Sequence, residues 1–358
     1  MRPLPVLLAS TLAATTGASC ASKPFENFVT FGDSYTDNGR LSYYAENDDK
    51  PPPAGVLQQQ LNVTASGGYA WGQFVQQYTG VAYFDYAVSG ATCSNEIISR
   101  YLAAIDEPFP SVVDDELPSF VADVQVQALY SNRTSENTVY ALWIGTNDLG
   151  YGAFLTDSQA PGTLRLGVST KLGQTNITTY IDCVWSVFDT IYSTGGRRFV
   201  LLNHAPLQFT PLYASQSNGG IGSSRYWVNK TLYNETEYEY KIMEYTQLVN
   251  RLFDYGVPFE LLVKARWPGA TFDIFDVHSL LTDIYENPSA YLDEPVNVTG
   301  YFKHCDPLNT SDCVYEPNPL NTFLWFDELH PSNKTDTTIA REFIGVVAGN
   351  SSYGTHYG

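Results

Sequence analysis

A serine stands directly after a short apolar segment, in a place where its side chain can act as a nucleophile. Residues 28–31 (Phe-Val-Thr-Phe) predict a buried strand, Gly32 ends it, and Asp33 and Ser34 follow on a turn. Open α/β sheets place their sites at such strand ends. A nucleophile also needs a base and donors for the oxyanion, so Ser34 taken alone is equally consistent with a helix N-cap.

A turn near the end of the chain contains the residues that would activate Ser34. Asp327 precedes His330 in the segment Asp-Glu-Leu-His-Pro, ahead of a helix predicted at 335–347. On a turn, this spacing lets the carboxylate reach the imidazole, fix its tautomer and stabilise the imidazolium. We therefore expect His330 to be the general base, with Asp327 behind it.

Two further turns provide donors for an oxyanion. Gly90 follows a strand predicted at 81–88 and can present its backbone N–H with no Cβ in the way. Asn147 follows a strand predicted at 139–144 and carries a side-chain amide. Together with the backbone N–H of Ser34 they form three predicted donors, and losing one such donor typically costs ~100- to 1000-fold in rate.

The segments between these turns predict one α/β domain with a parallel sheet, because strands alternate with helices and no repeat or linker interrupts them. The predicted strands are 28–31, 81–88, 139–144, 199–203 and 271–276, and the predicted helices are 69–78, 119–130, 177–191, 238–255, 278–285 and 335–347. Residues 104–118 are expected to be a loop and the C-terminal tail to be frayed. The insertions at 41–66, 214–236 and 287–322 are rich in Pro, Asn, Tyr and Gly. We expect them to wall the site into a pocket.

The four turns resemble the four sequence blocks of the GDSL family, also called SGNH hydrolases. Ser34, Gly90, Asn147 and His330 carry the resemblance, and Asp327 completes a Ser-His-Asp triad. Order and spacing match over nearly the whole mature chain. The resemblance implies a flavodoxin-like three-layer α/β/α sandwich with a sheet of about five strands, and ester hydrolysis without a metal or cofactor. The chain departs from the lipase elbow Gly-X-Ser-X-Gly, because no glycine follows Ser34 by two residues.

Within that family, the blocks are more similar to those of the fungal acetyl esterases grouped as carbohydrate esterase family sixteen. The similarity rests on Phe-Gly-Asp-Ser-Tyr-Thr-Asp-Asn-Gly at 31–39, Tyr-Ala-Val-Ser-Gly at 86–90, Leu-Trp-Ile-Gly-Thr-Asn-Asp-Leu-Gly at 142–150 and Trp-Phe-Asp-Glu-Leu-His-Pro at 325–331. It implies that the substrates are small acetylated sugars or oligosaccharides from hemicellulose. Tyr35 and Trp325 are then candidates for a sugar subsite, although core packing is a competing interpretation for aromatic residues.

Two other functions stay open. A GDSL lipase or phospholipase would act on longer acyl esters and would need a wide apolar cleft, but the sequence shows no amphipathic lid. A non-catalytic carbohydrate-binding protein on the same fold is disfavoured, because all five catalytic positions are present. Carboxylates are abundant enough for a glycosidase pair, but their context singles out no such pair.

Other titratable residues compete with the predicted triad. Asp276 and His278 lie two residues apart, but their surroundings are typical of a strand end that caps a helix. His204 is interpreted as structural, His304 lies in a predicted stapled loop, and His356 lies in the tail. Asp33 and Asp148 are expected to support their turns through hydrogen bonds.

The beginning of the chain and its modification sites predict export. Residues 1–20 combine a positive start, an apolar run and small residues near a cleavage site, as a secretory signal peptide does. Eight Asn-X-Ser/Thr sites are predicted to carry glycans, at Asn62, Asn132, Asn176, Asn229, Asn234, Asn297, Asn309 and Asn350. A ninth, at Asn333, is set aside because it lies so close to His330.

Cysteine usage, charge and hydropathy indicate which disulfides and which partners to expect. Four cysteines remain after the signal peptide, so we expect a Cys305–Cys313 bridge and, by elimination, a Cys93–Cys183 bridge. The formal net charge of −19 argues against a nucleic-acid partner, because phosphates would be repelled. No later segment is long and apolar enough to span a membrane, and we expect a secreted monomer without a metal site.

Overall fold

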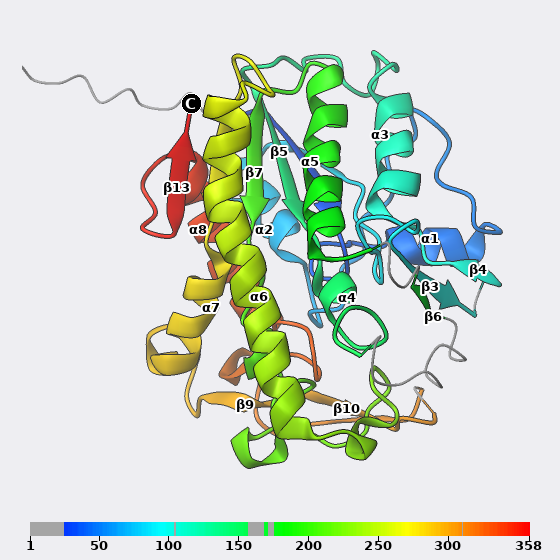
Figure 1. The fold of residues 1–358 in the computed structure, drawn as a ribbon, viewed down its shortest axis with the longest axis vertical. Coiled ribbons are helices and arrows are strands. Elements are labelled where there is room, and N and C mark those ends of the chain that lie inside the picture. The colour runs from blue at the N-terminus through cyan, green and yellow to red at the C-terminus, as the bar shows by residue number, and fades with distance from the viewer. Residues whose placement is uncertain (1–24, 104, 157–167, 171–174, 310) are drawn as a thin grey trace, which may run out of the picture.

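A six-stranded sheet forms the centre of the computed structural model, which describes residues 25–103, 105–156, 168–170, 175–309 and 311–358 (Figure 1). Five of its strands are parallel: β1 (Asn27–Gly32), β2 (Ala82–Asp85), β5 (Thr138–Trp143), β7 (Arg198–Leu202) and β8 (Thr271–Phe275). Their spatial order, counted along the chain, is 2-1-3-4-5, which is the flavodoxin-like order. The predicted α/β class and the five predicted strands are confirmed.

Helices cover both faces of this sheet, which explains why its strands are apolar at successive positions. Side chains alternate along a strand, so Phe28 and Phe31 of β1 point to opposite faces. The Phe28 ring lies 5.5 Å from that of Trp71 and 4.9 Å from that of Phe343, whereas the Phe31 ring lies 5.3 Å from that of Phe120. The result is a three-layer sandwich.

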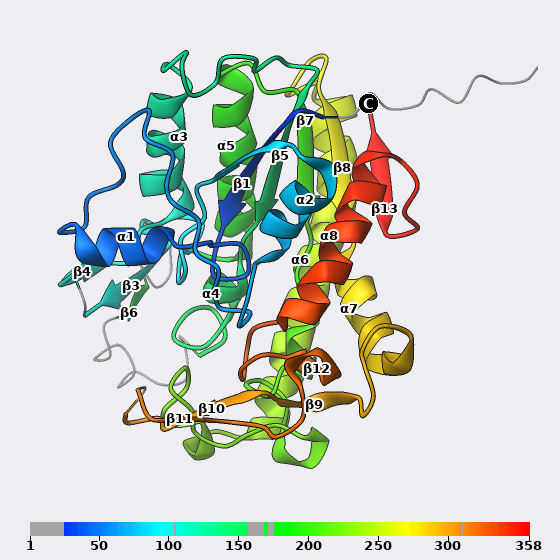
Figure 2. The same ribbon diagram turned by 180° about the vertical axis from the view of Figure 1, so that it is seen from behind.

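One outer layer contains α2 (Trp71–Thr79) and α8 (Asn333–Val347), which Figure 2 shows in front of the sheet. The other contains α3 (Leu117–Asp123), α5 (Ile177–Ser193) and α6 (Glu235–Pro258), in front in Figure 1. The shorter helices are α1 (Arg40–Glu46), α4 (Thr146–Leu149) and α7 (Val277–Glu286). The helix predicted at 119–130 is shorter than expected, since α3 ends at Asp123, and α1, which overlaps the start of the first insertion, was not predicted.

Smaller sheets are built from the long connections. β3 (Ile98–Leu102) pairs with β4 (Glu107–Pro108) and β6 (Val168–Thr170), β10 (Lys303–Cys305) pairs with β11 (Cys313–Tyr315), and β12 (Phe323–Trp325) pairs with β9 (Asn297–Tyr301). A π-helical turn, Val112–Glu116, leads directly into α3. The described part of the loop predicted at 104–118, residues 105–118, therefore contains a short strand and helical turns.

The C-terminal tail corrects a second expectation. Instead of fraying, it forms β13 (Gly354–Tyr357), the antiparallel edge strand of the main sheet, paired with β8. His356 lies on this strand, and its Nδ1 is 2.5 Å from Asp273 Oδ1. Phe343 of α8 also packs near Phe275 of β8, so the last residues add to the core from two sides.

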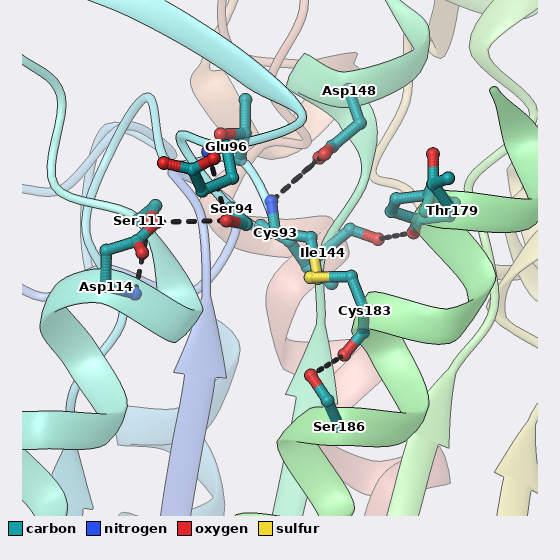
Figure 3. Close-up of a disulfide and its surroundings, with 12 residues drawn as sticks. Cys93, Ser94, Glu96, Ser111, Asp114, Ile144, Asp148, Thr179, Cys183 and Ser186 are labelled. Atoms are coloured by element: carbon teal, nitrogen blue, oxygen red, sulfur yellow. Dashed lines mark hydrogen bonds between the residues drawn. A yellow bond between two sulfur atoms is a disulfide. The ribbon is translucent and has the colours of Figure 1, made fainter. Parts of the chain in front are cut away.

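Both expected disulfides are present. Cys93, after β2, is bonded to Cys183 of α5, as Figure 3 shows. Cys305 and Cys313 close the β10–β11 hairpin. Among the expected glycosylation sites, six asparagines are exposed and two, Asn229 and Asn297, are half-buried; the exposed ones are Asn62, Asn132, Asn176, Asn234, Asn309 and Asn350.

Within the described part of the chain, no helix has the length and apolar character that crossing a membrane requires. The predicted signal peptide, residues 1–20, lies outside the described residues.

Candidate active site

The predicted nucleophile, base and carboxylate lie in a hydrogen-bonded row at the carboxyl ends of the parallel strands. Ser34 follows β1, and its Oγ lies 2.7 Å from Nε2 of His330. Nδ1 of His330 lies 2.8 Å from Oδ1 of Asp327. His330 and Asp327 are buried, whereas Ser34 is half-buried and reaches a pocket. This is the geometry of a serine, a general base and an orienting carboxylate.

The turn between Asp327 and His330 fixes its own carboxylate. Oδ1 of Asp327 accepts hydrogen bonds from the backbone N–H groups of Leu329 and His330, at 2.9 and 2.8 Å. These bonds hold the carboxylate beneath the imidazole, which is why a spacing of three residues suffices on this turn. Pro331 ends the turn and forms a bridge with Trp325, after which Ser332 caps α8.

Two residues that the sequence did not reveal bind the other oxygen of Asp327. Nη2 of Arg225 donates to Oδ2 at 2.6 Å, and the hydroxyl of Tyr226 donates to it at 3.0 Å. Burial alone would raise the pKa of the Asp327 carboxyl, but His330, Arg225 and the turn amides hold it well below its usual range. Asp327 is therefore an ionised, fully hydrogen-bonded partner for the imidazole.

The two other predicted oxyanion donors, a glycine N–H and an asparagine side chain, are also at this pocket. Gly90 and Asn147 both line it together with Ser34. The Nδ2 of Asn147 donates to the carbonyl of Ala91 at 2.9 Å, and since an amide nitrogen carries two hydrogens, one remains for a ligand. The Oδ1 of Asn147 accepts from Nη1 of Arg100 at 2.5 Å, and Arg100 is a third residue that the sequence did not reveal.

A glycine is required at position 90 for two reasons. Its φ of +90° is one that side chains with a Cβ rarely adopt. A Cβ built there would lie 2.4 Å from Cδ1 of Phe109. The aromatic ring therefore packs directly against the glycine that was predicted as an oxyanion donor.

Asp33 and Asp148 support the loops around the site, as expected. Oδ1 of Asp33 accepts from the N–H of Tyr35 at 3.0 Å, and Oδ1 of Asp148 accepts from the N–H of Cys93 at 3.0 Å, a bond visible in Figure 3. Burial raises the pKa of Asp33 to about 6 and that of Asp148 to about 7. Both carboxyls are turned toward backbone amides, which fits a structural role better than proton transfer.

The pocket has a volume of about 420 Å³, within the usual range for small-molecule sites. Leu41 and Ala65 of the first insertion line it, as do Arg225 and Tyr226 of the second. Among the described residues of the third insertion, 287–309 and 311–322, none lines the pocket, so in the described structure two of the three predicted walls are present.

The two aromatic residues proposed for a sugar subsite are not at the pocket surface. Tyr35 is 1 % exposed and its hydroxyl donates to the carbonyl of Leu329, while Trp325 is 0 % exposed and its indole donates to the carbonyl of Val298. Packing inside the fold, the competing interpretation, is therefore the one that the structure supports for both. The aromatic residues that do line the pocket are Phe109, Tyr151, Tyr213 and Tyr226.

The rival Asp-His pair does not form. Asp276 caps α7, and its carboxylate accepts from Ser279 and from Asn203 rather than from His278. His204 is buried beside the hydroxyl of Tyr180, and burial lowers its pKa to about 3.

The remaining histidines are also engaged elsewhere. His304 pairs with Glu316 on the stapled hairpin, and His356 pairs with Asp273. The described residues contain no group of three or more His, Cys, Asp and Glu side chains that could hold a metal ion.

Comparison with known proteins identifies the family. The family model described as GDSL-like Lipase/Acylhydrolase matches residues 28–343. The chain belongs to this family. It is also 52% identical over 355 residues to an acetylesterase of Hypocrea jecorina, with 98% of each chain covered. The chain is therefore a carboxylic ester hydrolase.

More distant relatives add less. An acetylesterase of Thermothelomyces thermophilus is 29% identical over 209 residues, which cover 55% of this GDSL protein and 61% of the relative. A solved structure of a possible lipase from Chitinophaga pinensis is 15% identical, with 89% of this chain and 96% of that chain covered and a TM-score of 0.35. At that score the structural likeness carries no argument.

Proposed function

We propose that this GDSL esterase removes acetyl groups from small carbohydrates, using Ser34 as nucleophile, His330 as general base and Asp327 as the orienting carboxylate. The observation that carries the proposal is the unbroken row from Ser34 Oγ to His330 Nε2 to the Asp327 carboxylate, which ends at the pocket. In this arrangement the imidazole can take the serine proton as Oγ attacks an ester carbonyl.

The reaction proceeds in two steps. In the first, Ser34 Oγ bonds to the acetyl carbon, His330 takes its proton, and the carbonyl oxygen becomes an oxyanion. Collapse of this intermediate expels the sugar alkoxide, which receives the proton from His330, and leaves an acetyl-enzyme. In the second, His330 takes a proton from water as the water oxygen attacks the acetyl carbon, and collapse of this intermediate returns the proton from His330 to Ser34 Oγ and releases acetic acid, which ionises to acetate in solution.

The oxyanion formed in each step would be held by the N–H groups of Ser34 and Gly90 and by Nδ2 of Asn147. All three residues line the same pocket: Ser34 follows β1, Gly90 follows β2 and Asn147 lies in α4, after β5. Fixed donors of this kind stabilise the transition state more than the neutral ester, and this difference lowers the barrier. The developing imidazolium is stabilised by the ionised Asp327 carboxylate.

The proposed acetyl and carbohydrate specificity is supported by the relatives, both named acetylesterases, and by the hydrogen-bonding side chains that stand among the apolar residues of the pocket lining. Three tyrosines and two arginines line it: Tyr151, Tyr213, Tyr226, Arg100 and Arg225. Hydroxyl and guanidinium groups suit a sugar; a long acyl chain would gain ~0.8 kcal/mol per methylene only where it met further apolar surface.

Export of this enzyme, as a single catalytic domain that acts as a monomer, is also proposed. The predicted signal peptide, the two disulfides and the exposure of six predicted glycosylation sites support the proposed export. Disulfides persist in oxidising compartments, which fits a protein that works outside the cell.

Hydrolysis of a series of p-nitrophenyl esters tests the proposed substrate class. We expect kcat/KM to fall steeply from acetate to butyrate and to be near zero for long acyl chains. Ser34→Ala, run in parallel, should abolish hydrolysis of every ester and so controls for background reaction. Rates that stay level or rise with chain length would reject the acetyl preference and favour a lipase.

Acetylated xylo-oligosaccharides test the sugar part of the proposal. Release of acetate from these oligomers should be faster than from polymeric acetylated xylan, because the substrate has to enter a pocket. A preference for the polymer would contradict this part without affecting the proposed triad.

A further inference from the structure

Arg100 binds two of the three residues that carry the proposed oxyanion donors. It lies on β3, outside the four sequence blocks of the family, and lines the pocket. Its Nη1 donates to the carbonyl of Gly90 at 3.0 Å and to Oδ1 of Asn147 at 2.5 Å. Gly90 lies after β2 and Asn147 lies in α4, after β5, so one guanidinium group connects two segments that are far apart in the chain.

The contacts of Asn147 allow its amide to adopt one orientation. Arginine is a donor without acceptor atoms, so the atom that faces Arg100 has to be the amide oxygen. The carbonyl of Ala91 is an acceptor, so the atom that faces it, at 2.9 Å, has to be the amide nitrogen. A flipped amide would place its NH₂ group against a cation and its oxygen against a carbonyl. Arg100 and Ala91 together therefore keep Nδ2 at the site where an oxyanion would form.

Arg100 is itself held in place by its neighbours. Its guanidinium carbon lies 5.3 Å from the centroid of the Phe109 ring, and its carbonyl accepts from the N–H of Phe109 at 2.7 Å. Phe109 also packs against Gly90, and the Cys93–Cys183 disulfide, shown in Figure 3, fixes the start of the segment that leads to β3. The contact with Asn147 thus comes from a well-anchored side chain.

We propose that Arg100 is a positioning residue for the oxyanion site, acting by fixing the side-chain amide of Asn147 in its donating orientation. This inference rests on the proposed function, because it assumes that the Nδ2 of Asn147 stabilises an oxyanion. Arg100 transfers no proton and forms no covalent bond in this role. Its contribution appears in the transition state, where the orientation of the donor matters most.

A double-mutant cycle between Arg100→Met and Asn147→Ala tests the proposal, with p-nitrophenyl acetate as substrate. Arg100→Met keeps an unbranched side chain and removes every donor. Losing one oxyanion donor typically costs ~100- to 1000-fold, so a donor that is only misoriented should cost about 10- to 100-fold in kcat, with KM within about three-fold of wild type. In the Asn147→Ala background, the same change should cost less than about three-fold, because the group that Arg100 orients is gone.

Two controls separate positioning from general stability. Arg251→Met replaces a largely exposed arginine on α6 that does not line the pocket, and its kcat should match that of wild type. If Arg100→Met does not fold, Arg100→Lys takes its place in the cycle. The lysine ammonium should produce a smaller loss in kcat, and this loss should again disappear in the Asn147→Ala background.

Two results would overturn the inference. The first is a kcat for Arg100→Met close to that of wild type, and the second is an equal fold-loss in the presence and absence of the Asn147 amide. Ser34→Ala distinguishes these failures from failure of the proposed function. If Ser34→Ala is inactive while the cycle is additive, the proposed function stands and the role of Arg100 is wrong.

Discussion

A methyl group at position 90 perturbs the oxyanion site at its backbone. Gly90→Ala forces a Cβ onto a residue with a φ of +90°, which costs about 1–2 kcal/mol in unfolding free energy for an L-residue. The same Cβ would lie 2.4 Å from Cδ1 of Phe109, and relieving such overpacking typically costs about 1–3 kcal/mol more. The total destabilisation is then about 2–5 kcal/mol.

Gly195 offers a matched control for the backbone part of this effect. Its φ is +96°, and a Cβ there would meet no atom within 4 Å. Gly195→Ala should therefore lower stability by only the backbone cost, about 1–2 kcal/mol, and leave activity unchanged. In Gly90→Ala, part of the loss in unfolding free energy comes from contact with the Phe109 ring. The double variant Gly90→Ala/Phe109→Ala should recover much of that part.

Thermal unfolding and steady-state hydrolysis of p-nitrophenyl acetate provide the two readouts. Moving the N–H of residue 90 away from the oxyanion should lower kcat of Gly90→Ala by ~100- to 1000-fold, with the protein still folded at the assay temperature. A Gly90→Ala protein with kcat within about three-fold of wild type would refute the assignment of this N–H as a donor.

Three further changes have expected outcomes. Removing the Cys93–Cys183 bridge by double serine substitution should lower the unfolding free energy by about 4–5 kcal/mol, because the bridge spans 90 residues; a denaturant titration that shows no loss contradicts this. The pKa of Asp148 is raised by burial to about 7 from 3.8, so its proton stabilises the fold below about pH 4, and this stability is lost as pH rises through about 7. The melting temperature should therefore fall between pH 5 and pH 8, and it should fall less in Asp148→Asn. An equal fall in melting temperature in both proteins would be evidence against the raised pKa. Tyr226→Phe removes one donor from Asp327 and should reduce kcat several-fold without a large change in melting temperature, and an unchanged kcat would show that this bond is not needed.

The local pattern of the sequence predicted the elements that carry the four blocks. Apolar runs that end in turns marked β1, β2 and β5, and the turns after them contain Ser34 and Asn147. Parallel strands bring such turns to one edge of the sheet, so residues distant in the chain were expected to meet. The turn at Asp327 was also readable, because its hydrogen bonds are local.

Contacts made by single side chains across long stretches of chain were not predictable in the same way. Arg100 and Arg225 stand in segments without a strong periodic pattern, and no local signal shows that their guanidinium groups meet Asn147 and Asp327. An aromatic side chain beside a predicted nucleophile does not show whether it faces solvent or the core. The prediction that Tyr35 lines a sugar subsite was wrong for this reason, since Tyr35 is buried under the turn that carries His330.

The C-terminal edge strand was missed because its pattern is weak. β13 is four residues long, polar in part and glycine-containing, and it lies at the edge of the sheet with half-buried and exposed side chains. Its pairing is decided by β8, far away in the sequence, and not by its own propensity.

Covalent trapping of the nucleophile tests the central claim most directly. A fluorophosphonate that reacts with activated serines is incubated with the enzyme, and the modified residue is located by peptide mass spectrometry. We predict a single adduct on Ser34, loss of esterase activity in proportion to labelling, and neither labelling nor activity in a folded Ser34→Ala protein. Labelling of another residue with loss of activity, or a Ser34→Ala protein that still hydrolyses acetyl esters, would contradict the account.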